Sequence, residues 1–441
     1  MTARSARALA RAGVTRRRAR TRQVAGALSR HGLGWAVGRR GLRRVVPFHR
    51  GWLGHPRREL PYTPPEHVRL VAEELGATFV KLGQLLSTRA DLLPPPYQAE
   101  LARLQDAAPP EPWPAIEAVL SAEIGAKAAG SLGVIEPVPL AAASIGQAHA
   151  GTLADGTEVV VKVRRPGVVE LVEVDLELLE RAAGALARRW GVAARYDLVG
   201  LASQFSDTLR AELDYVREAA NAKRFAANFS GDPAVHIPEV FGELSTARVL
   251  TLERVRGLKV DDLAGLAAAG IDRQGLARRA ARVTLQMVFR DGFFHADPHP
   301  GNFFVEPDGR LGIIDFGMVG AIDASTRGKL LAALAAVATG DGDGVVDNLL
   351  ALGFAGADVE RAGLRDDLVR LFRSQLDRPL GEVAIGPLFG RLFALVRRHR
   401  LVLPPSLALL FKTIVMSEGL GARLDPSFRL LDALSSFAGP P

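Results

Sequence analysis

The chain has 441 residues, of which 48% are apolar and 24% charged, a composition typical of a folded protein with two or three domains. It contains no cysteine, which excludes disulfides, thiolate metal sites and cysteine nucleophiles and favours a reducing compartment. No segment resembles a secretory signal peptide, and none reaches the roughly 18–20 apolar residues of a membrane-spanning helix. We therefore expect a cytoplasmic chain with no transmembrane helix.

Charge is divided unevenly along the sequence. Residues 1–60 hold 16 basic residues and one acidic residue, a net charge of +15, whereas the remaining 381 residues carry −7. We expect this basic arm to be partly ordered, with short amphipathic helices, and to lie on the inner face of a membrane. Anionic lipid is the favoured partner, and nucleic-acid phosphate is the alternative.

The pattern of apolar residues predicts an α+β fold. A helical period predicts helices over residues 66–93, 113–128, 168–190 and 198–229. Alternation bounded by turn residues predicts short strands at residues 134–135, 147–152, 157–163, 240–243, 247–252 and 311–314. These elements divide the chain into a basic arm, a helical extension, a small antiparallel lobe with a helical insert, and a mostly helical lobe, over residues 1–60, 61–132, 133–256 and 257–441.

One loop of the last segment combines several polar side chains. In HADPHPGNF, residues 295–303, Asp297 precedes Asn302 by five residues, and Asp315 of IIDFG follows thirteen residues later. Phosphoryl transfer from ATP needs a carboxylate that orients the attacking group and accepts its proton, and oxygen ligands that hold Mg²⁺. The spacing matches the catalytic loop and Asp-Phe-Gly segment of kinases. It predicts Asp297 as the base and Asn302 and Asp315 as Mg²⁺ ligands.

Two other interpretations of this loop are open. His295, Asp297 and His299 alternate along the chain and would surround a transition metal if the stretch were extended, but Pro298 and Pro300 oppose a regular strand. A polar turn without chemistry is the second alternative. We expect His295 to be a structural residue packed behind the loop.

The stretch TEVVVKV places Lys162 after three valines. A lysine in such an apolar run needs an anion, so we predict contact with the α- and β-phosphates of ATP. The alternative is a lysine that extends its ammonium group from an edge strand into water. Glu218 is the favoured carboxylate partner; Asp214 is expected to share its helix face, and Glu212 is not.

The turn before that strand lacks the glycines of a kinase phosphate-binding loop. The stretch PLAAASIGQAHAG has Ala141, Ala142, Ala143 and Ser144 where G-x-G-x-x-G is expected. Alanine restricts φ more than glycine does, which limits how closely backbone amides can surround a phosphate. We predict nucleotide contacts from these four residues and from Glu253, which follows the last strand of the small lobe.

Together these motifs resemble the UbiB/AarF (ADCK-type) family of atypical, protein-kinase-like proteins, over roughly residues 66–430. The resemblance rests on KLGQ at Lys81–Gln84, AAAS, VVVK, ELD at Glu212–Asp214, HADPHPGN and DFG. It implies a bilobal protein-kinase-like fold, ATP or ADP with Mg²⁺, ATPase or unorthodox kinase activity, and a link to ubiquinone-type isoprenoid lipids at membranes. It also implies a regulatory active-site role for Lys81, Gln84, Glu212 and Asp214.

The polar residues of the helix around Lys81 give this role a geometric basis. Lys81, Gln84 and Thr88 lie three and four residues apart and share one face. We expect the helix to cover the catalytic cleft, with Lys81 contacting Glu212 or Asp214 and Gln84 near the nucleotide. A solvated helix face is the alternative.

Three functions are compatible with the sequence. The leading one is a kinase-like ATPase that acts on, or extracts, prenyl-lipid intermediates. A small-molecule phosphotransferase of the aminoglycoside or choline kinase type shares the H-x-D-x4-N loop but lacks KLGQ and DFG, and a nucleotide-sensing scaffold without turnover would suit the alanine-rich turn. No Pro-Glu pair follows Asp315, which disfavours peptide substrates. Whether the chain forms a homodimer is left open.

Overall fold

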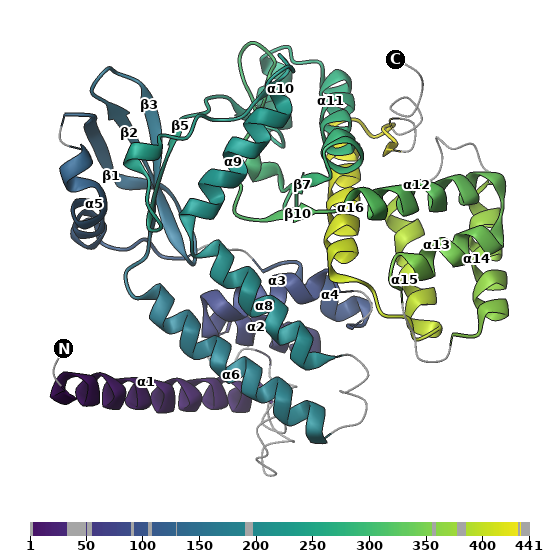
Figure 1. Cartoon of the computed structure of the whole chain (residues 1–441), viewed down its shortest axis with the longest axis horizontal. Helices are drawn as coiled ribbons and strands as arrows, with labels where there is room; N and C mark the ends of the chain where they lie inside the picture. The colour runs from purple at the N-terminus through teal and green to yellow at the C-terminus, as the bar shows by residue number, and fades with distance from the viewer. Residues whose placement is uncertain are drawn as a thin grey trace. The chain divides into compact units, whose positions relative to one another are not determined.

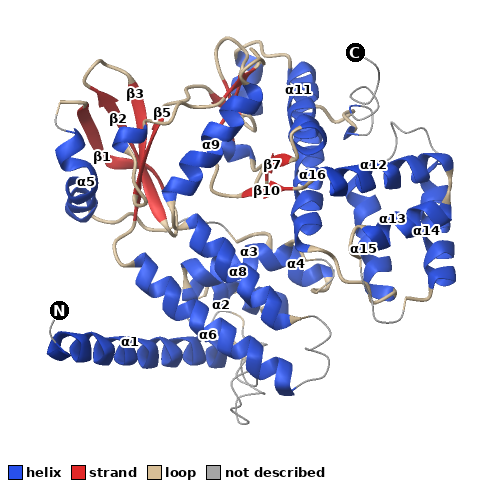
Figure 2. Cartoon of the chain, viewed as in Figure 1, coloured by secondary structure: helices blue, strands red, loops and turns tan. Residues whose placement is uncertain are grey.

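The structure is a computed structural model in which contacts divide the chain into two units, each treated separately below. The residues it describes are 3–32, 50, 55–89, 92–104, 108–128, 130–189, 197–354, 359–376, 385–430 and 433. The first unit comprises residues 1–126, 135–150 and 162–213, and the second comprises residues 127–134, 151–161 and 214–441. The fold class is α+β, as predicted, with many helices and small sheets (Figure 2).

The predicted small sheet is present and has the strand order β1-β2-β3-β5 (Figure 1). Its strands are β1 (Leu132–Ala142), β2 (Gly146–Leu153), β3 (Glu158–Arg164) and β5 (Val249–Glu253). The β2-β3 turn contains Gly156 at φ 88°, a left-handed conformation that only glycine adopts at no steric cost. The strand predicted at 240–243 is wrong: Val240 makes a single bridge to Leu252, and η2 (Gly242–Leu244) is a 3₁₀ turn.

Helices make up most of the first unit. They are α1 (Ala3–Arg30), α2 (Pro64–Leu75), α3 (Ala77–Ser87), α4 (Pro95–Leu101), α5 (Trp113–Ala128, apart from its last two residues), α6 (Val168–Arg189) and α8 (Leu198–Glu212). The predictions for α5 and α6 are confirmed. The single helix predicted over 66–93 is instead two, because Gly76 at φ 84° ends α2 and begins α3.

The described part of the basic arm is one long helix rather than several short ones. Helix α1 has 28 residues and packs on α2 and α6, with Ala27 in a small core against Val71 and Leu75. Residues 33–49 and 51–54 of the predicted arm lie outside the described residues. The helix α1 of the basic arm is therefore packed within the first unit.

A buried ion pair joins α1 to α6. The Arg20 guanidinium donates from Nε to Asp175 Oδ1 at 2.7 Å and from Nη2 to Asp175 Oδ2 at 2.8 Å, and Nη2 also donates to the Leu75 carbonyl at 2.6 Å. Arg20 is 8% exposed and Asp175 is fully buried. Arg20 of the basic arm thus stabilises the packing of α1 on α6 and is not available to bind an external partner.

The second unit combines short strands with a helical bundle. Its helical elements are α9 (Tyr215–Phe229), α10 (Leu263–Ala268), α11 (Arg273–Leu285), the π-helical turn η3 (Gln286–Arg290), the 3₁₀ turn η4 (Pro300–Asn302), α12 (Ala324–Thr339), α13 (Gly342–Ala351), α14 (Arg361–Leu376), α15 (Ile385–Arg398) and α16 (Pro405–Leu424). Its further strands are β4 (Val235–His236), β6 (Leu258–Lys259), β7 (Phe293–His295), β8 (Phe303–Val305), β9 (Leu311–Ile313) and β10 (Val319–Ala321). The strand predicted near 311–314 is β9.

One large apolar core holds the second unit together. It extends from α9 and α11 through β7, β8 and β9 to α16, and Phe225, Phe294 and Phe316 are among its fully buried side chains. Helices α11 and α16 lie side by side (Figure 1). Among the described residues, no helix is long and apolar enough to cross a bilayer.

The helix predicted over 198–229 is also two helices. Helix α8 ends at Glu212, and α9 begins at Tyr215 with Asp214 as its N-cap, whose carboxylate accepts from Val216 N at 3.1 Å. Asp214 therefore does not share a helix face with Glu218, contrary to the prediction. A capping aspartate was read as a mid-helix residue because the apolar period continues through the break.

The Arg20–Asp175 pair generates a prediction about stability. Arg20→Ala leaves a buried carboxylate without its counter-charge, so we expect a loss of about 3–5 kcal/mol in the free energy of unfolding. The exposed Arg22→Ala is the matched control and should change it by less than about 0.5 kcal/mol. Urea denaturation measures both.

A second variant separates charge from packing. Arg20→Met combined with Asp175→Leu removes both charges and keeps apolar volume, so most of the lost stability should return. If Arg20→Ala and Arg22→Ala unfolded at the same urea concentration, the buried pair would have no structural role.

Candidate active site

The loop HADPHPGNF is attached to a short antiparallel hairpin. Strand β8 pairs with β9 so that Phe303 is opposite Ile313, and the Asn302 carbonyl accepts from Ile314 N at 2.9 Å. Asn302 therefore precedes one strand at the level where Ile314 follows the other, and Asp315 is the next residue. Two residues thirteen positions apart in sequence are brought to the same end of one hairpin.

The donor atoms at this end suit a hard divalent cation. The Asn302 amide donates from Nδ2 to the Asp297 carbonyl at 3.1 Å, which directs its nitrogen into the loop and leaves the amide oxygen for a ligand. Asp315 contributes a carboxylate, of which Oδ1 accepts from Gly317 N at 3.2 Å. Amide and carboxylate oxygens are ligands that Mg²⁺ accepts, so the residues present fit this ion.

Asp315 has a strained backbone. Its φ is +65°, in the left-handed region that costs a non-glycine residue about 1–2 kcal/mol. Such strain persists only where surrounding contacts determine the conformation, and it is concentrated at functional sites. The observation supports a functional role for Asp315.

Helix α9 supplies those contacts. Glu218 Oε1 accepts from Phe316 N at 3.2 Å, and Asn221 Nδ2 donates to the Phe316 carbonyl at 2.9 Å. Glu218 is 6% exposed. The two side chains, three residues apart on one helix face, therefore hold both backbone groups of the residue after Asp315. The sequence analysis did not identify Asn221, although its i+3 spacing from Glu218 was visible.

His295 is a structural residue, as expected. It is buried between Phe225, Phe303 and Phe316, with ring centroids 5.8–6.4 Å away, and burial lowers the pKa of its imidazole. The hydrogen bonds assign a neutral ring: Nδ1 accepts from Asp297 N at 3.2 Å, and Nε2 lies 3.4 Å from the Ile314 carbonyl.

The transition-metal interpretation of the loop is not supported. Both ring nitrogens of His295 face backbone groups, and His299 Nδ1 accepts from Gly301 N at 3.1 Å. Among the described residues no group of three or more His, Asp or Glu side chains is arranged to hold a metal ion. The loop therefore offers Asp297 and Asn302 to a ligand, and its histidines maintain its shape.

A lysine that the sequence analysis missed lies beside Asp297. Lys412 of α16 donates from Nζ to Asp297 Oδ1 at 3.1 Å, with the two side chains 18% and 39% exposed. Sequence spacing gave no signal for this contact, which joins residues 115 positions apart.

Lys162 lies on β3, where buried and half-buried residues alternate. Val159, Val161 and Val163 face the interior, and Lys162 is half-buried on the opposite face. Lys162 belongs to the first unit and Glu218 to the second, so their predicted pairing stays a prediction.

The alanine-rich stretch is partly strand and partly turn. Strand β1 continues through Ala141 and Ala142, and Ala143 N donates to the Gly146 carbonyl at 2.8 Å, which closes a tight turn around Ser144. Arg165 holds this turn because its Nε donates to the Ala143 carbonyl at 2.8 Å. The sequence analysis did not anticipate this support.

Glu253, the other predicted nucleotide contact, is engaged within the second unit. Its Oε2 lies 3.2 Å from His236 Nε2 and accepts from Glu239 N at 3.1 Å. Its contact with a nucleotide stays a prediction.

The KLGQ motif shows the expected ion pair. Lys81 Nζ lies 2.9 Å from Glu212 Oε2, and the side chains are 16% and 10% exposed. Gln84 donates from Nε2 to the Leu104 carbonyl at 3.2 Å. Gly83 is required by packing, because a Cβ there would collide with the Leu104 side chain. Asp214, the other expected partner, belongs to the second unit, where it caps α9.

The catalytic-loop hairpin, its support from α9 and the KLGQ ion pair agree with a known family. A model described as the ABC1 atypical kinase-like domain matches residues 103–349, and one described as the UbiB helical domain matches residues 368–429. The chain belongs to the UbiB family of atypical kinase-like proteins. Its α+β fold is kinase-like, as the sequence motifs implied.

Relatives in bacteria support this family assignment. A probable protein kinase UbiB of Marinobacter nauticus is 35% identical over 376 residues, 84% of this chain and 69% of the relative. The probable protein kinase UbiB of Pseudomonas entomophila is 37% identical over 90% of this chain and 74% of its own length. A solved Mycobacterium tuberculosis protein in complex with erythromycin has a TM-score of 0.59 and 28% identity, covering 84% of this chain and 95% of that chain.

The two family models divide the candidate active site between them. Asp297, Asn302 and Asp315 fall within the ABC1 kinase-like match, and Lys412 falls within the UbiB helical match. The helical domain of this UbiB-family chain thus contributes a side chain to the loop of the kinase-like domain.

Proposed function

We propose that this UbiB-family protein binds ATP or ADP with Mg²⁺ and hydrolyses or transfers the terminal phosphate of ATP. The observation that carries the proposal is the arrangement of Asp297, Asn302 and strained Asp315 around one hairpin. Asn302 and Asp315 would hold Mg²⁺, which neutralises phosphate charge when bound. Asp297 orients the attacking hydroxyl group or water and accepts its proton.

The same proposal includes an isoprenoid, ubiquinone-type lipid intermediate as the substrate or cargo. Its support is the family membership, together with the prediction that the Lys81 helix, α3, covers the cleft where a peptide substrate would otherwise enter. A small-molecule phosphotransferase is the weaker alternative, because KLGQ and DFG are both present. A scaffold that binds nucleotide without turnover is the other, and measurement of phosphate release separates it from an enzyme.

Nucleotide binding should depend on a divalent cation. We expect ATP with Mg²⁺ to raise the melting temperature of the wild type, since a ligand at one hundred times its Kd adds about 2.7 kcal/mol to the free energy of unfolding. ATP with EDTA should raise the melting temperature far less. Asp315→Asn should remove the Mg²⁺-dependent part and ATP hydrolysis. Asp308→Asn, an exposed carboxylate on the same hairpin, should behave as the wild type. If ATP raised the melting temperature equally in Mg²⁺ and in EDTA, the roles of Asn302 and Asp315 as Mg²⁺ ligands would be contradicted.

Lys81 should control nucleotide preference. Its ammonium group balances Glu212 in a largely buried pair, so Lys81→Ala changes the charge beside the nucleotide as well as packing. We expect a severalfold change in the ratio of ADP to ATP affinity and incorporation of phosphate into the protein itself. The exposed Lys127→Ala is the control.

The outcomes for Lys81 are separable. A Lys81→Ala protein that melts lower but keeps wild-type nucleotide affinities and shows no self-phosphorylation would assign α3 a packing role only. Melting temperature, calorimetric affinity and phosphate incorporation, measured on one preparation, distinguish the two results.

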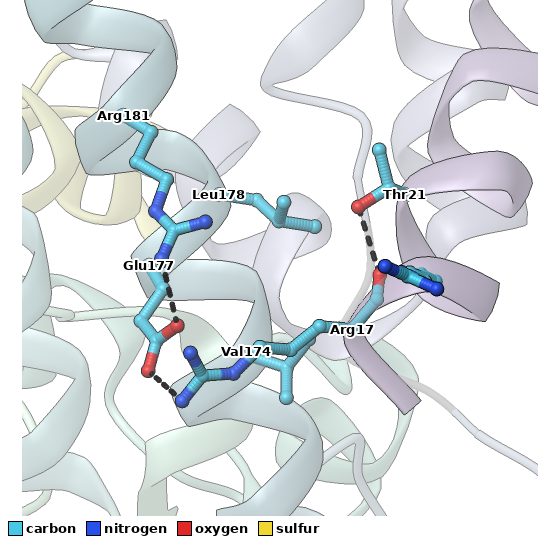
Figure 3. A pocket seen from close by; sticks show the side chains of 7 residues that line it. Arg17, Thr21, Val174, Glu177, Leu178 and Arg181 are labelled. Carbon is cyan, nitrogen blue, oxygen red and sulfur yellow. Dashed lines mark hydrogen bonds and ion pairs between the residues drawn. The ribbon is translucent and has the colours of Figure 1, made fainter. Parts of the chain in front are cut away.

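We further propose that the basic arm attaches the protein to the inner face of an anionic membrane. A pocket of about 260 Å³ between α1 and α6 supports this proposal (Figure 3). It is lined by Arg17, Arg18 and Arg181, against one acid, Glu177, which pairs with Arg17 at 2.8 Å. Three guanidinium groups and one carboxylate leave a net positive site for a lipid phosphate, which Arg binds well.

Vesicle binding tests this attachment. Replacement of Arg17, Arg18 and Arg181 by alanine should weaken co-sedimentation with phosphatidylglycerol vesicles, because each basic residue near such a surface contributes about 1 kcal/mol. A control protein carries alanine at three exposed arginines of the second unit, residues 278, 361 and 370. Unchanged vesicle binding at physiological salt, or binding to DNA in preference to vesicles, would contradict the proposal.

A further inference from the structure

Lys412 lies where a charge is costly. It is the one charged residue between Arg400 and Glu418, in a helix whose neighbouring Leu407, Leu410 and Phe411 are buried in the core. A largely buried ammonium group needs an anion nearby to offset its lost hydration. That anion is the Asp297 carboxylate, 3.1 Å from Nζ.

Helix α16 holds this lysine on a rigid support. One residue on, Thr413 Oγ1 lies 3.4 Å from the His295 carbonyl, and one turn later Ser417 Oγ lies 3.1 Å from Thr284 Oγ1 of α11. The two helices run alongside each other (Figure 1). The helix that carries Lys412 is therefore held to the loop at His295 and to α11 at Thr284.

The loop itself brings no cation. Residues 295–303 contain no Lys or Arg, whereas Asp297 and Asp315 both carry negative charge. Two carboxylates would repel a triphosphate, and the transition state of phosphoryl transfer is stabilised by cations placed at its oxygens. A cation from outside the loop is required for this chemistry, beyond the metal ion.

The Lys412 ammonium group has unused donors. It carries three protons, and Asp297 Oδ1 is its one hydrogen-bond acceptor among the residues that the structure describes. Asp297 is 39% exposed, so the pair is open to a ligand on one side. The geometry fits a lysine that donates to Asp297 and to a phosphate oxygen together.

We propose that Lys412 binds the terminal phosphate of ATP, an inference that rests on the proposed function. During transfer, a bond forms between the acceptor oxygen and the γ-phosphorus, and the bond from that phosphorus to the β–γ bridging oxygen breaks. The bridging oxygen leaves with the electron pair on ADP, and the acceptor proton passes to Asp297. Lys412 donates to the oxygens of the transferred group and keeps Asp297 in place.

The test compares ATP with ADP, because only ATP has the phosphate in question. Lys412→Met should weaken ATP binding in Mg²⁺ by about 10- to 100-fold, the loss expected for a hydrogen bond to a charged group, and change ADP affinity less than about twofold. Lys412→Arg, which keeps the charge, should restore much of the ATP affinity. Calorimetric titration of both nucleotides into one preparation gives their affinity ratio, which partial unfolding does not alter.

The matched control is Lys329→Met. Lys329 lies in the same unit and donates to the Ala351 carbonyl at 2.9 Å, away from the loop. The ratio of ATP affinity to ADP affinity of this control variant should equal that of the wild type. If Lys412→Met lost both nucleotides equally, or neither, the inference would be overturned while the proposed function stood. If the wild type bound neither nucleotide in Mg²⁺, the proposed function would fail and the inference with it.

Discussion

The antiparallel pairing of β8 with β9 is the constraint on which the candidate active site depends. Because Phe303 is opposite Ile313, the residues just before one strand and just after the other lie at one level. Asn302 is therefore opposite Ile314, and Asp315 is the next residue. Its left-handed backbone, at φ 65°, departs from the alternation of faces that a continued strand would impose on its side chain. A ladder of three residue pairs, together with the conformation of Asp315, thus sets the spacing of the two residues proposed to bind Mg²⁺, which the intervening sequence alone does not determine.

The strain at Asp315 explains why α9 carries polar side chains on its inner face. A left-handed aspartate relaxes unless its neighbours are held, and Glu218 and Asn221 hold the amide and carbonyl of Phe316. The buried Phe316 ring adds an apolar contact with Phe225, and the two ring centroids are 5.2 Å apart. Displacement of α9 would therefore release the Asp315 conformation, so the position of this helix determines the geometry of the candidate active site.

Sequence patterns predicted the grouping of the candidate site residues better than they predicted helix ends. Asp297, Asn302 and Asp315 could be found because their spacing is local to one loop and one hairpin. The breaks at Gly76 and Asp214 were missed, since the apolar period continues across both and only the backbone conformation reveals the turn. Propensity is a weak guide where one residue with positive φ or one capping side chain ends a helix.

The polar side chains that the sequence analysis missed were missed for a different reason. Asn221, Arg165 and Lys412 act on loops far from them in the chain, and no local spacing predicts which distant carbonyl or carboxylate a side chain will reach. The ion pair between Lys81 and Glu212 was expected only because the family resemblance pointed to Glu212 and Asp214 as partners. Long-range polar contacts depend on tertiary packing, which binary patterns of apolar and polar residues do not encode.

Burial separates the ion pairs of this protein into two kinds. Arg20 and Asp175 have almost no exposed surface and four hydrogen bonds from one guanidinium group, so the pair has no access to a ligand and serves packing. Lys412 and Asp297 are joined by one contact and keep 18% and 39% exposure. A pair with spare donors and an open side loses little when a phosphate joins it, because the ligand replaces water rather than a protein partner. By exposure, Lys81 and Glu212, at 16% and 10%, lie between the two kinds, since the pair joins two helices and keeps some contact with water.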